Sequence, residues 1–138
     1  MSSPELDNLV KIGKLKREPP SARELERLFK SAQTRLADAA RAELNFDSRF
    51  DLAYNAAHAL ALYALRKVGY RSENRYLVFQ ALQHTAGLPP EAWRVLAKAH
   101  ERRNLFEYEG RLERDEKLLA ELIAIAERLR TLLQERAK

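Results

Sequence analysis

The residues best able to carry chemistry lie close together in the segment 99–110, which has a helical pattern. At about 100° per residue, Arg103 falls at the edge of an apolar stripe, between His100 and Glu107. Asn104 and Tyr108 follow along the adjoining face. A guanidinium at a packed edge needs a partner, and Glu107, four residues on, can supply one. The segment therefore has two interpretations: a structural Arg103–Glu107 ion pair, or one wall of a polar cleft.

A second line of polar residues runs along the segment 49–68. Asp51, Asn55, His58, Leu62 and Arg66 follow one another at spacings of four, three, four and four, which places them on one side of a helix. The rest of this segment is mostly Ala and Leu, so an Asn and a His on one line stand out. They form either a solvated stripe or the second wall of a cleft that faces the Arg103 helix.

The sequence excludes several other kinds of site. It has no Gly-x-Gly-x-x-Gly motif and no Walker-type loop, which phosphate-binding nucleotide folds use. It has no Cys, and its three histidines (His58, His84, His100) lack paired ligand spacing or a Glu-x-x-His motif. We therefore predict no metal ion and no cofactor.

Helices must position the candidate residues, because no segment has a strand pattern. Ser21 and Glu24 have the spacing of a capping box at a helix start. In the next helix, alanines recur along the apolar face, which indicates close packing at the centre of the fold. The expected helices are 21–45, 49–68, 73–84, 90–108 and 113–134. The first begins at Ser21 and ends at Asn45. Asp47 or Ser48 is expected to cap the second, and Ser72 the third. This pattern predicts an all-α, up-and-down bundle of four or five helices.

The chain length of 138 residues fits a single domain. Prolines mark residues 1–20 as an N-terminal tail or a short docking helix, and residues 21–138 as the bundle domain. Lys and Arg number 25 against 20 Asp and Glu. Because this excess is spread along the chain, it is typical of a solvated surface, although it allows RNA binding. No apolar run is long enough for a membrane span and no signal peptide opens the chain, so we expect a soluble, cytoplasmic protein.

The chain resembles a HEPN domain over roughly residues 21–135. The resemblance rests on the order of helices, the Ala-rich second helix closing in Val68-Gly69-Tyr70, and the pair Arg103-Asn104. It implies a small, often dimeric helical bundle of the kind found beside nucleotidyltransferases and in toxin–antitoxin and other RNA-targeting systems. Active members carry an Arg, often a polar residue next, and then a His after four to six positions, and two protomers together form a metal-independent ribonuclease site. In this chain Tyr108 stands where that His is expected.

The resemblance implies, first, a homodimeric binding module without efficient catalysis. Its cleft would be formed by Arg103, Asn104 and Tyr108 and lined by Asp51, Asn55, His58 and Glu107. Its ligand would be RNA, a nucleotide or a partner protein such as a nucleotidyltransferase. A phenol, with a pKa near 10, is a poor base at neutral pH, which disfavours catalysis by Tyr108.

The second implied function is a divergent metal-independent ribonuclease of toxin–antitoxin type. Arg103 would bind the scissile phosphate and Asn104 would orient it, while Tyr108 or His100 would transfer the proton. A third interpretation, from the residues alone, is a structural bundle in which the Arg103–Glu107 pair serves only packing.

Overall fold

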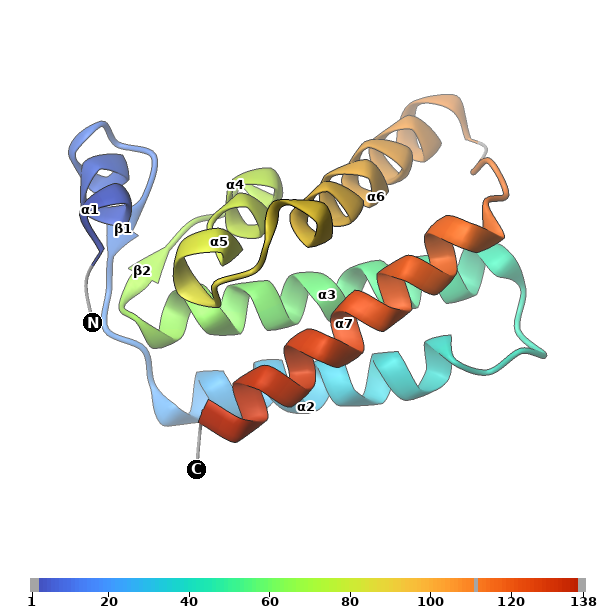
Figure 1. Cartoon of the computed structure of the whole chain (residues 1–138), viewed down its shortest axis with the longest axis horizontal. Helices are drawn as coiled ribbons and strands as arrows, with labels where there is room; N and C mark the ends of the chain where they lie inside the picture. Colours follow the sequence, from blue (N-terminus) through green and yellow to red (C-terminus); the bar gives the residue numbers. More distant parts are fainter. Residues whose placement is uncertain (1–2, 111, 137–138) are drawn as a thin grey trace.

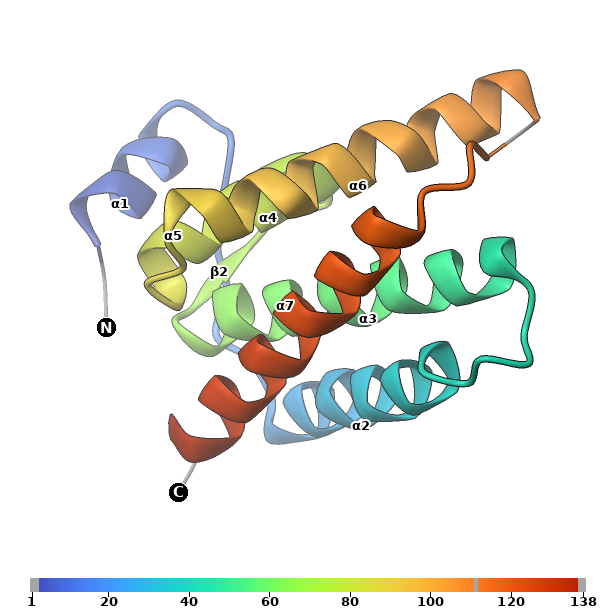
Figure 2. The same cartoon turned by 45° about the vertical axis from the view of Figure 1, so that its right-hand side comes forward.

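Helices form most of the chain, and the longest of them, α3, lies at their centre (Figures 1 and 2). The computed structural model describes residues 3–110 and 112–136. Its elements are α1 (Pro4–Lys11), β1 (Lys16–Arg17), α2 (Ala22–Ala39), α3 (Phe46–Lys67), β2 (Tyr70–Arg71), α4 (Arg75–Gln80), α5 (Leu82–Thr85), α6 (Pro90–Glu109) and α7 (Glu116–Arg136). The predicted all-α class is confirmed.

The small apolar face of α3 lets its neighbours approach closely. α2 packs along one side of α3, α7 crosses both helices, and α4 and α6 lie on the other side of α3 (Figures 1 and 2). The expected alanines are buried at 0–3% exposure: Ala53, Ala56, Ala57, Ala61 and Ala64. The predicted central position of this helix is therefore confirmed. Within the described ranges, no helix is long and apolar enough to cross a membrane.

Several predicted helix boundaries are wrong by a few residues. α2 ends at Ala39 rather than Asn45, and α3 begins at Phe46, with Asn45 rather than Asp47 or Ser48 in the N-cap position. The predicted helix 73–84 is two short helices, α4 and α5, and its cap is Asn74, whose Oδ1 accepts a hydrogen bond from the Leu77 amide (3.0 Å). The Ser21 cap is confirmed, since its Oγ accepts from the Glu24 amide (3.1 Å).

The expectation of no strand is wrong at one place. β1 and β2 pair antiparallel, with Lys16 opposite Arg71 and Arg17 opposite Tyr70. Each strand has two residues, which is too short to show the alternating pattern that identifies a strand from sequence. The pairing joins the first twenty residues to the end of α3.

Residues 3–20 pack on the body of the protein through α1 and β1. Leu6 and Leu15 are buried. The Tyr70 hydroxyl donates to Asp7 Oδ1 (2.6 Å), and Arg17 forms an ion pair with the same carboxylate. This segment is therefore a docked helix and strand.

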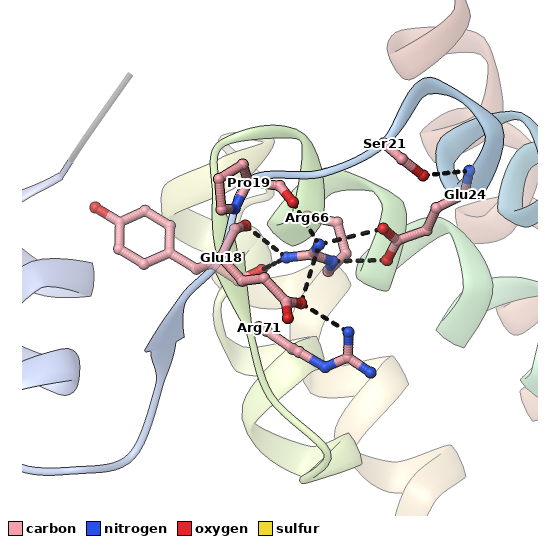
Figure 3. Close-up of polar contacts among 7 residues, drawn as sticks. Glu18, Pro19, Ser21, Glu24, Arg66 and Arg71 are labelled. Carbon is pink, nitrogen blue, oxygen red and sulfur yellow. Dashed lines mark hydrogen bonds and ion pairs between the residues drawn. The ribbon is translucent and has the colours of Figure 1, made fainter.

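Arg66, near the end of α3, is the one buried charged residue in the described part of the chain, with 2% exposure. Its Nε donates to Glu24 Oε1 (2.7 Å) and its Nη2 to Glu24 Oε2 (3.2 Å), as Figure 3 shows. The other guanidinium N–H groups donate to the backbone oxygens of Glu18, Pro19 and Tyr70 at 2.8–3.2 Å. Arg66 shares a side of α3 with Asp51, but it does not meet the Arg103 helix: it fastens the N-terminal segment and the start of α2 to α3.

Candidate functional site

Arg103 lies where α6 passes α3, and two carboxylates hold it. Its Nη1 donates to Glu107 Oε1 (2.6 Å), which is the ion pair expected from the spacing of four. Its Nε donates to Asp51 Oδ1 (3.2 Å) on α3. The Arg103 side chain is 25% exposed, against 62% for Glu107 and 52% for Asp51. The structure therefore brings the two predicted walls together at Asp51, Arg103 and Glu107, with the positive charge of Arg103 already balanced by protein groups.

His100 and Asn104 form a hydrogen-bonded chain beside this ion pair. His100 Nδ1 lies 2.9 Å from the Tyr54 hydroxyl, and His100 Nε2 lies 3.2 Å from Asn104 Nδ2. Either neutral tautomer fits this chain, because the phenol can donate or accept and the amide can turn its nitrogen or its oxygen to the ring. Burial, and to a lesser extent the charge of Arg75, lower the pKa of His100. His100 is thus a neutral imidazole with both nitrogens engaged.

Arg75, at the start of α4, adds a second positive charge on the same face. Its Nη1 donates to Asn55 Oδ1 (3.1 Å), and its guanidinium carbon lies 5.6 Å from the centre of the Tyr54 ring. Among residues 3–110 and 112–136, no carboxylate lies within ion-pair distance of Arg75. Burial raises the pKa of the Tyr54 phenol despite the nearby Arg75. Arg75 is therefore an unbalanced cation at the edge of a ring cluster.

Aromatic rings from α4 and α6 cover the space between Arg75 and His100. Tyr76 packs edge-on against Trp93 with ring centroids 5.5 Å apart, and against His100 at 5.8 Å. Tyr76 is 43% exposed. On α6, Trp93, His100 and Asn104 share a side, because they are seven and four residues apart. We call the surface made by Arg75, Tyr76, Trp93, His100 and Asn104 the ring face.

Sequence reasoning did not select Arg75, Tyr76, Trp93 or Tyr54 for the site. Arg75 and Tyr76 stand in the first turn of a helix more than twenty residues before His100, so no local spacing connects them. The one available signal was an Arg-Tyr pair at a helix start, and that signal is weak.

Two predicted site residues lie apart from Arg103 and Asn104. His58 packs edge-on against Phe79, with ring centroids 5.8 Å apart. The Phe79 ring also packs against His100, with ring centroids 6.3 Å apart. His58 instead lines a cavity of about 280 Å³ with Glu24, Arg66, Arg71, Ser72, Glu73 and Arg75. Burial lowers the pKa of His58 to about 4. Tyr108, in the last turn of α6, is 89% exposed and makes no hydrogen bond to any side chain that the structure describes.

The site offers no grouping of ligands for a metal ion. In the described ranges, no three His, Asp or Glu side chains come close enough together to hold one. The arrangement instead combines cations, an amide and the exposed ring of Tyr76, which are groups that contact bases and phosphates.

Comparisons with protein-family models, with characterised proteins and with solved structures found no significant match. The structure itself defines an all-α protein with a ring face formed by α4 and α6. The chemistry of that face therefore carries the functional argument.

Proposed function

We propose that this chain is a HEPN-like helical binding module that holds RNA on the ring face without efficient catalysis. The observation that carries this proposal is the exposed ring of Tyr76, set between Trp93 and His100 and next to the unbalanced cation Arg75. An unpaired base can stack on such a ring while its phosphate meets the guanidinium. An RNA ligand is consistent with the cytoplasmic location expected from the sequence.

The hydrogen bonds that already engage Arg103 and His100 support binding rather than catalysis. A phosphate that approached Arg103 would have to displace Asp51 or Glu107. A general base needs a free lone pair near the proton it removes, and both His100 nitrogens are engaged by Tyr54 and Asn104. Tyr108 lies exposed with no described neighbour that would activate its hydroxyl.

Removing the Tyr76 ring is expected to weaken RNA binding roughly tenfold, the effect typical of losing one base–aromatic stack. The measurement is fluorescence anisotropy of a labelled, short single-stranded RNA with the wild type and with Tyr76→Ala. Ile12→Ala is the matched control, because Ile12 is a large apolar residue with 67% exposure in the N-terminal segment. Equal affinities for wild type and Tyr76→Ala would contradict RNA binding at the ring face.

One observation favours the divergent ribonuclease as a second candidate: His100, Asn104 and Arg103 are neighbours on α6, and His100 and Asn104 are hydrogen-bonded. A substrate that displaced Tyr54 or Asn104 would free an imidazole nitrogen near Arg103. Such an enzyme would be metal-independent and of toxin–antitoxin type.

We expect no cleavage of single-stranded RNA by the purified wild type in the presence of EDTA. Arg103→Ala, checked for equal folding by circular dichroism, serves as the comparison. Cleavage by the wild type that disappears in Arg103→Ala would replace the binding-module proposal with the ribonuclease.

We also propose that the module is a homodimer that uses the distal end of α6. Leu105 and Tyr108 are exposed there, at 43% and 89%, and lie one to five residues beyond Arg103 and Asn104. Burying them against a second copy would place two ring faces near each other, and a nucleotidyltransferase-type protein is the alternative partner for the same surface. Contiguous exposed apolar patches often mark protein–protein interaction sites.

Light scattering at micromolar concentration is expected to give twice the 15.9 kDa mass of one chain. The double variant Leu105→Asp, Tyr108→Asp is expected to give a single-chain mass with unchanged helicity. A wild type with the mass of one chain would rule out the homodimer and leave the partner protein as the alternative.

A further inference from the structure

The outer side of α2 carries a row of cations that the ring face does not include. At about 100° per residue, Arg23, Arg27, Lys30 and Thr34 fall within about 60° of one another, and Arg35 lies next to them. The opposite side of α2 holds the core residues Ala32, Leu36 and Ala39. Arg23, Arg27, Lys30 and Arg35, which we call the α2 stripe, are all exposed and point away from the bundle.

The α2 stripe has a net positive charge, and the acidic residues Glu26 and Asp38 lie near its side of the helix. In the part of the chain that the structure describes, none of its four residues lies within ion-pair distance of a carboxylate. The acidic residue nearest in sequence to Arg23, Glu24, is bound to Arg66. Elsewhere arginines are commonly paired, as Arg17, Arg41, Arg71, Arg103, Arg114 and Arg130 show. Four exposed cations without a carboxylate partner among the described residues therefore lie along this one helix.

A shallow hollow on this helix combines the cations with hydroxyl groups. It is lined by Arg27, Lys30, Ser31, Thr34 and Arg35. The Arg35 guanidinium donates to Ser31 Oγ, which holds this arginine over the hollow. Hydroxyls and guanidinium groups together are the usual contacts of phosphate oxygens.

We propose that the α2 stripe binds the phosphodiester backbone of an RNA strand, without reading its bases. From Arg23 to Arg35 the helix rises about 18 Å, which is long enough to follow several successive phosphates. The row contains cations and hydroxyls but no aromatic ring, so its contacts depend on charge and not on base identity. Binding there releases condensed counterions and is strongly salt-dependent.

The exposed residues of α2 favour RNA over an anionic membrane. A helix that lies on a membrane buries large apolar side chains between its cations. The large apolar residues exposed in the described structure are Ile12, Tyr76, Leu105 and Tyr108, and none of them belongs to α2. The stripe therefore matches a soluble polyanion.

The choice of RNA as the ligand of the α2 stripe rests on the proposed function. The α2 stripe itself is a different surface from the ring face. α2 packs on the side of α3 that is turned away from α4 and α6 (Figures 1 and 2). The two surfaces also use different forces: stacking at Tyr76 and charge along α2. Each can therefore be removed without touching the other.

The test compares two variants with the same change in net charge. The stripe variant replaces four residues by Gln: Arg23, Arg27, Lys30 and Arg35. The control variant replaces four exposed, scattered cations by Gln: Lys14, Lys98, Lys117 and Arg128. Anisotropy with a labelled single-stranded RNA over a KCl series gives the slope of log K against log salt concentration. The stripe variant is expected to reduce the magnitude of this slope by about 2–3, since each phosphate contact contributes about 0.7 to it. Its affinity for RNA is expected to fall more than tenfold.

The outcomes separate this inference from the proposed function. Equal losses in the stripe and control variants would overturn the stripe, because net charge alone would then explain them. Tighter binding of the wild type to vesicles of anionic phospholipid than to RNA would also overturn it. If the stripe variant loses affinity while Tyr76→Ala keeps it, the inference stands and the ring face fails. If Tyr76→Ala alone loses affinity, the ring face stands and the stripe fails.

Discussion

Replacing Arg66 with alanine is expected to lower the free energy of unfolding by about 3–5 kcal/mol, as breaking a buried ion pair does. Arg66 is 2% exposed, and its five N–H groups donate to the Glu24 carboxylate and to three backbone carbonyls, those of Glu18, Pro19 and Tyr70 (Figure 3). Alanine leaves the three carbonyl oxygens without this donor and leaves the Glu24 carboxylate, whose side chain is 32% exposed, without its cation. Urea unfolding followed by circular dichroism measures the loss.

Arg71→Ala is the matched control for this prediction. Arg71 pairs with the same Glu18 (2.7 Å), yet both side chains are about half exposed, at 47% and 48%. An exposed pair of this kind contributes at most about 1 kcal/mol. Arg66→Lys is expected to fall between the two variants, because an ammonium keeps the charge but cannot donate in the planar fork that Glu24 accepts. If Arg66→Ala proves as stable as Arg71→Ala, the network is not what fastens the N-terminal segment.

Sequence patterns predicted the parts of the fold that local interactions determine. The Ser21 cap acts over three residues, and the alanine face of α3 repeats every three or four residues, so both are visible in a short window. The start of α3 was misplaced because Asp47 and Ser48 are good caps in isolation. In the structure, Phe46 stacks with Phe50 one turn on (5.9 Å), and burying this pair sets the helix start at Asn45.

The polar line on α3 shows why the candidate site was predictable only in part. Asp51, Asn55, His58 and Arg66 do share a side of the helix, but α3 has 22 residues and is about 33 Å long. Different elements pack along that length. Asp51 meets Arg103 on α6, and Asn55 meets Arg75 on α4. Arg66 meets the N-terminal segment and the start of α2, which are 42–48 residues away in sequence. Helical spacing gives the side of a helix, whereas the partner of each residue depends on tertiary packing.

The ring face depends on the same long-range packing. Tyr76 and Trp93 belong to different helices and meet only because the short helices α4 and α5 turn the chain back onto α6. The Arg103–Glu107 pair, by contrast, was predictable because it lies within one helix at a spacing of four.

Lowering the pH from 7 to 5 is expected to reduce the free energy of unfolding by about 2 kcal/mol through His58. Burial, together with the positive charge of Arg75, lowers the pKa of His58 from 6.5 to about 4 in the folded protein. Between these two values the unfolded chain binds a proton that the folded chain does not. Stability from this group is thus full above pH 6.5 and is lost as the pH falls toward 4. His100, whose pKa is also lowered, adds to the loss in the same direction.

Urea unfolding at pH 7, 6 and 5 tests this prediction. His58→Gln is expected to remove most of the change in the free energy of unfolding between pH 7 and pH 5. The window avoids the carboxylates Asp7 and Glu24, whose pKa values are lowered and whose stabilisation is lost only at more acidic pH. His84→Gln is the matched control, because His84 is exposed at the end of α5. If His58→Gln keeps the wild-type pH dependence of stability, the titrating group is not His58. The same measurement on His100→Gln then decides whether the imidazole of the ring face causes this pH dependence. If the pH dependence is lost in His58→Gln, the cavity beside Phe79 accommodates a neutral imidazole, which adds no fourth positive charge to those of Arg66, Arg71 and Arg75.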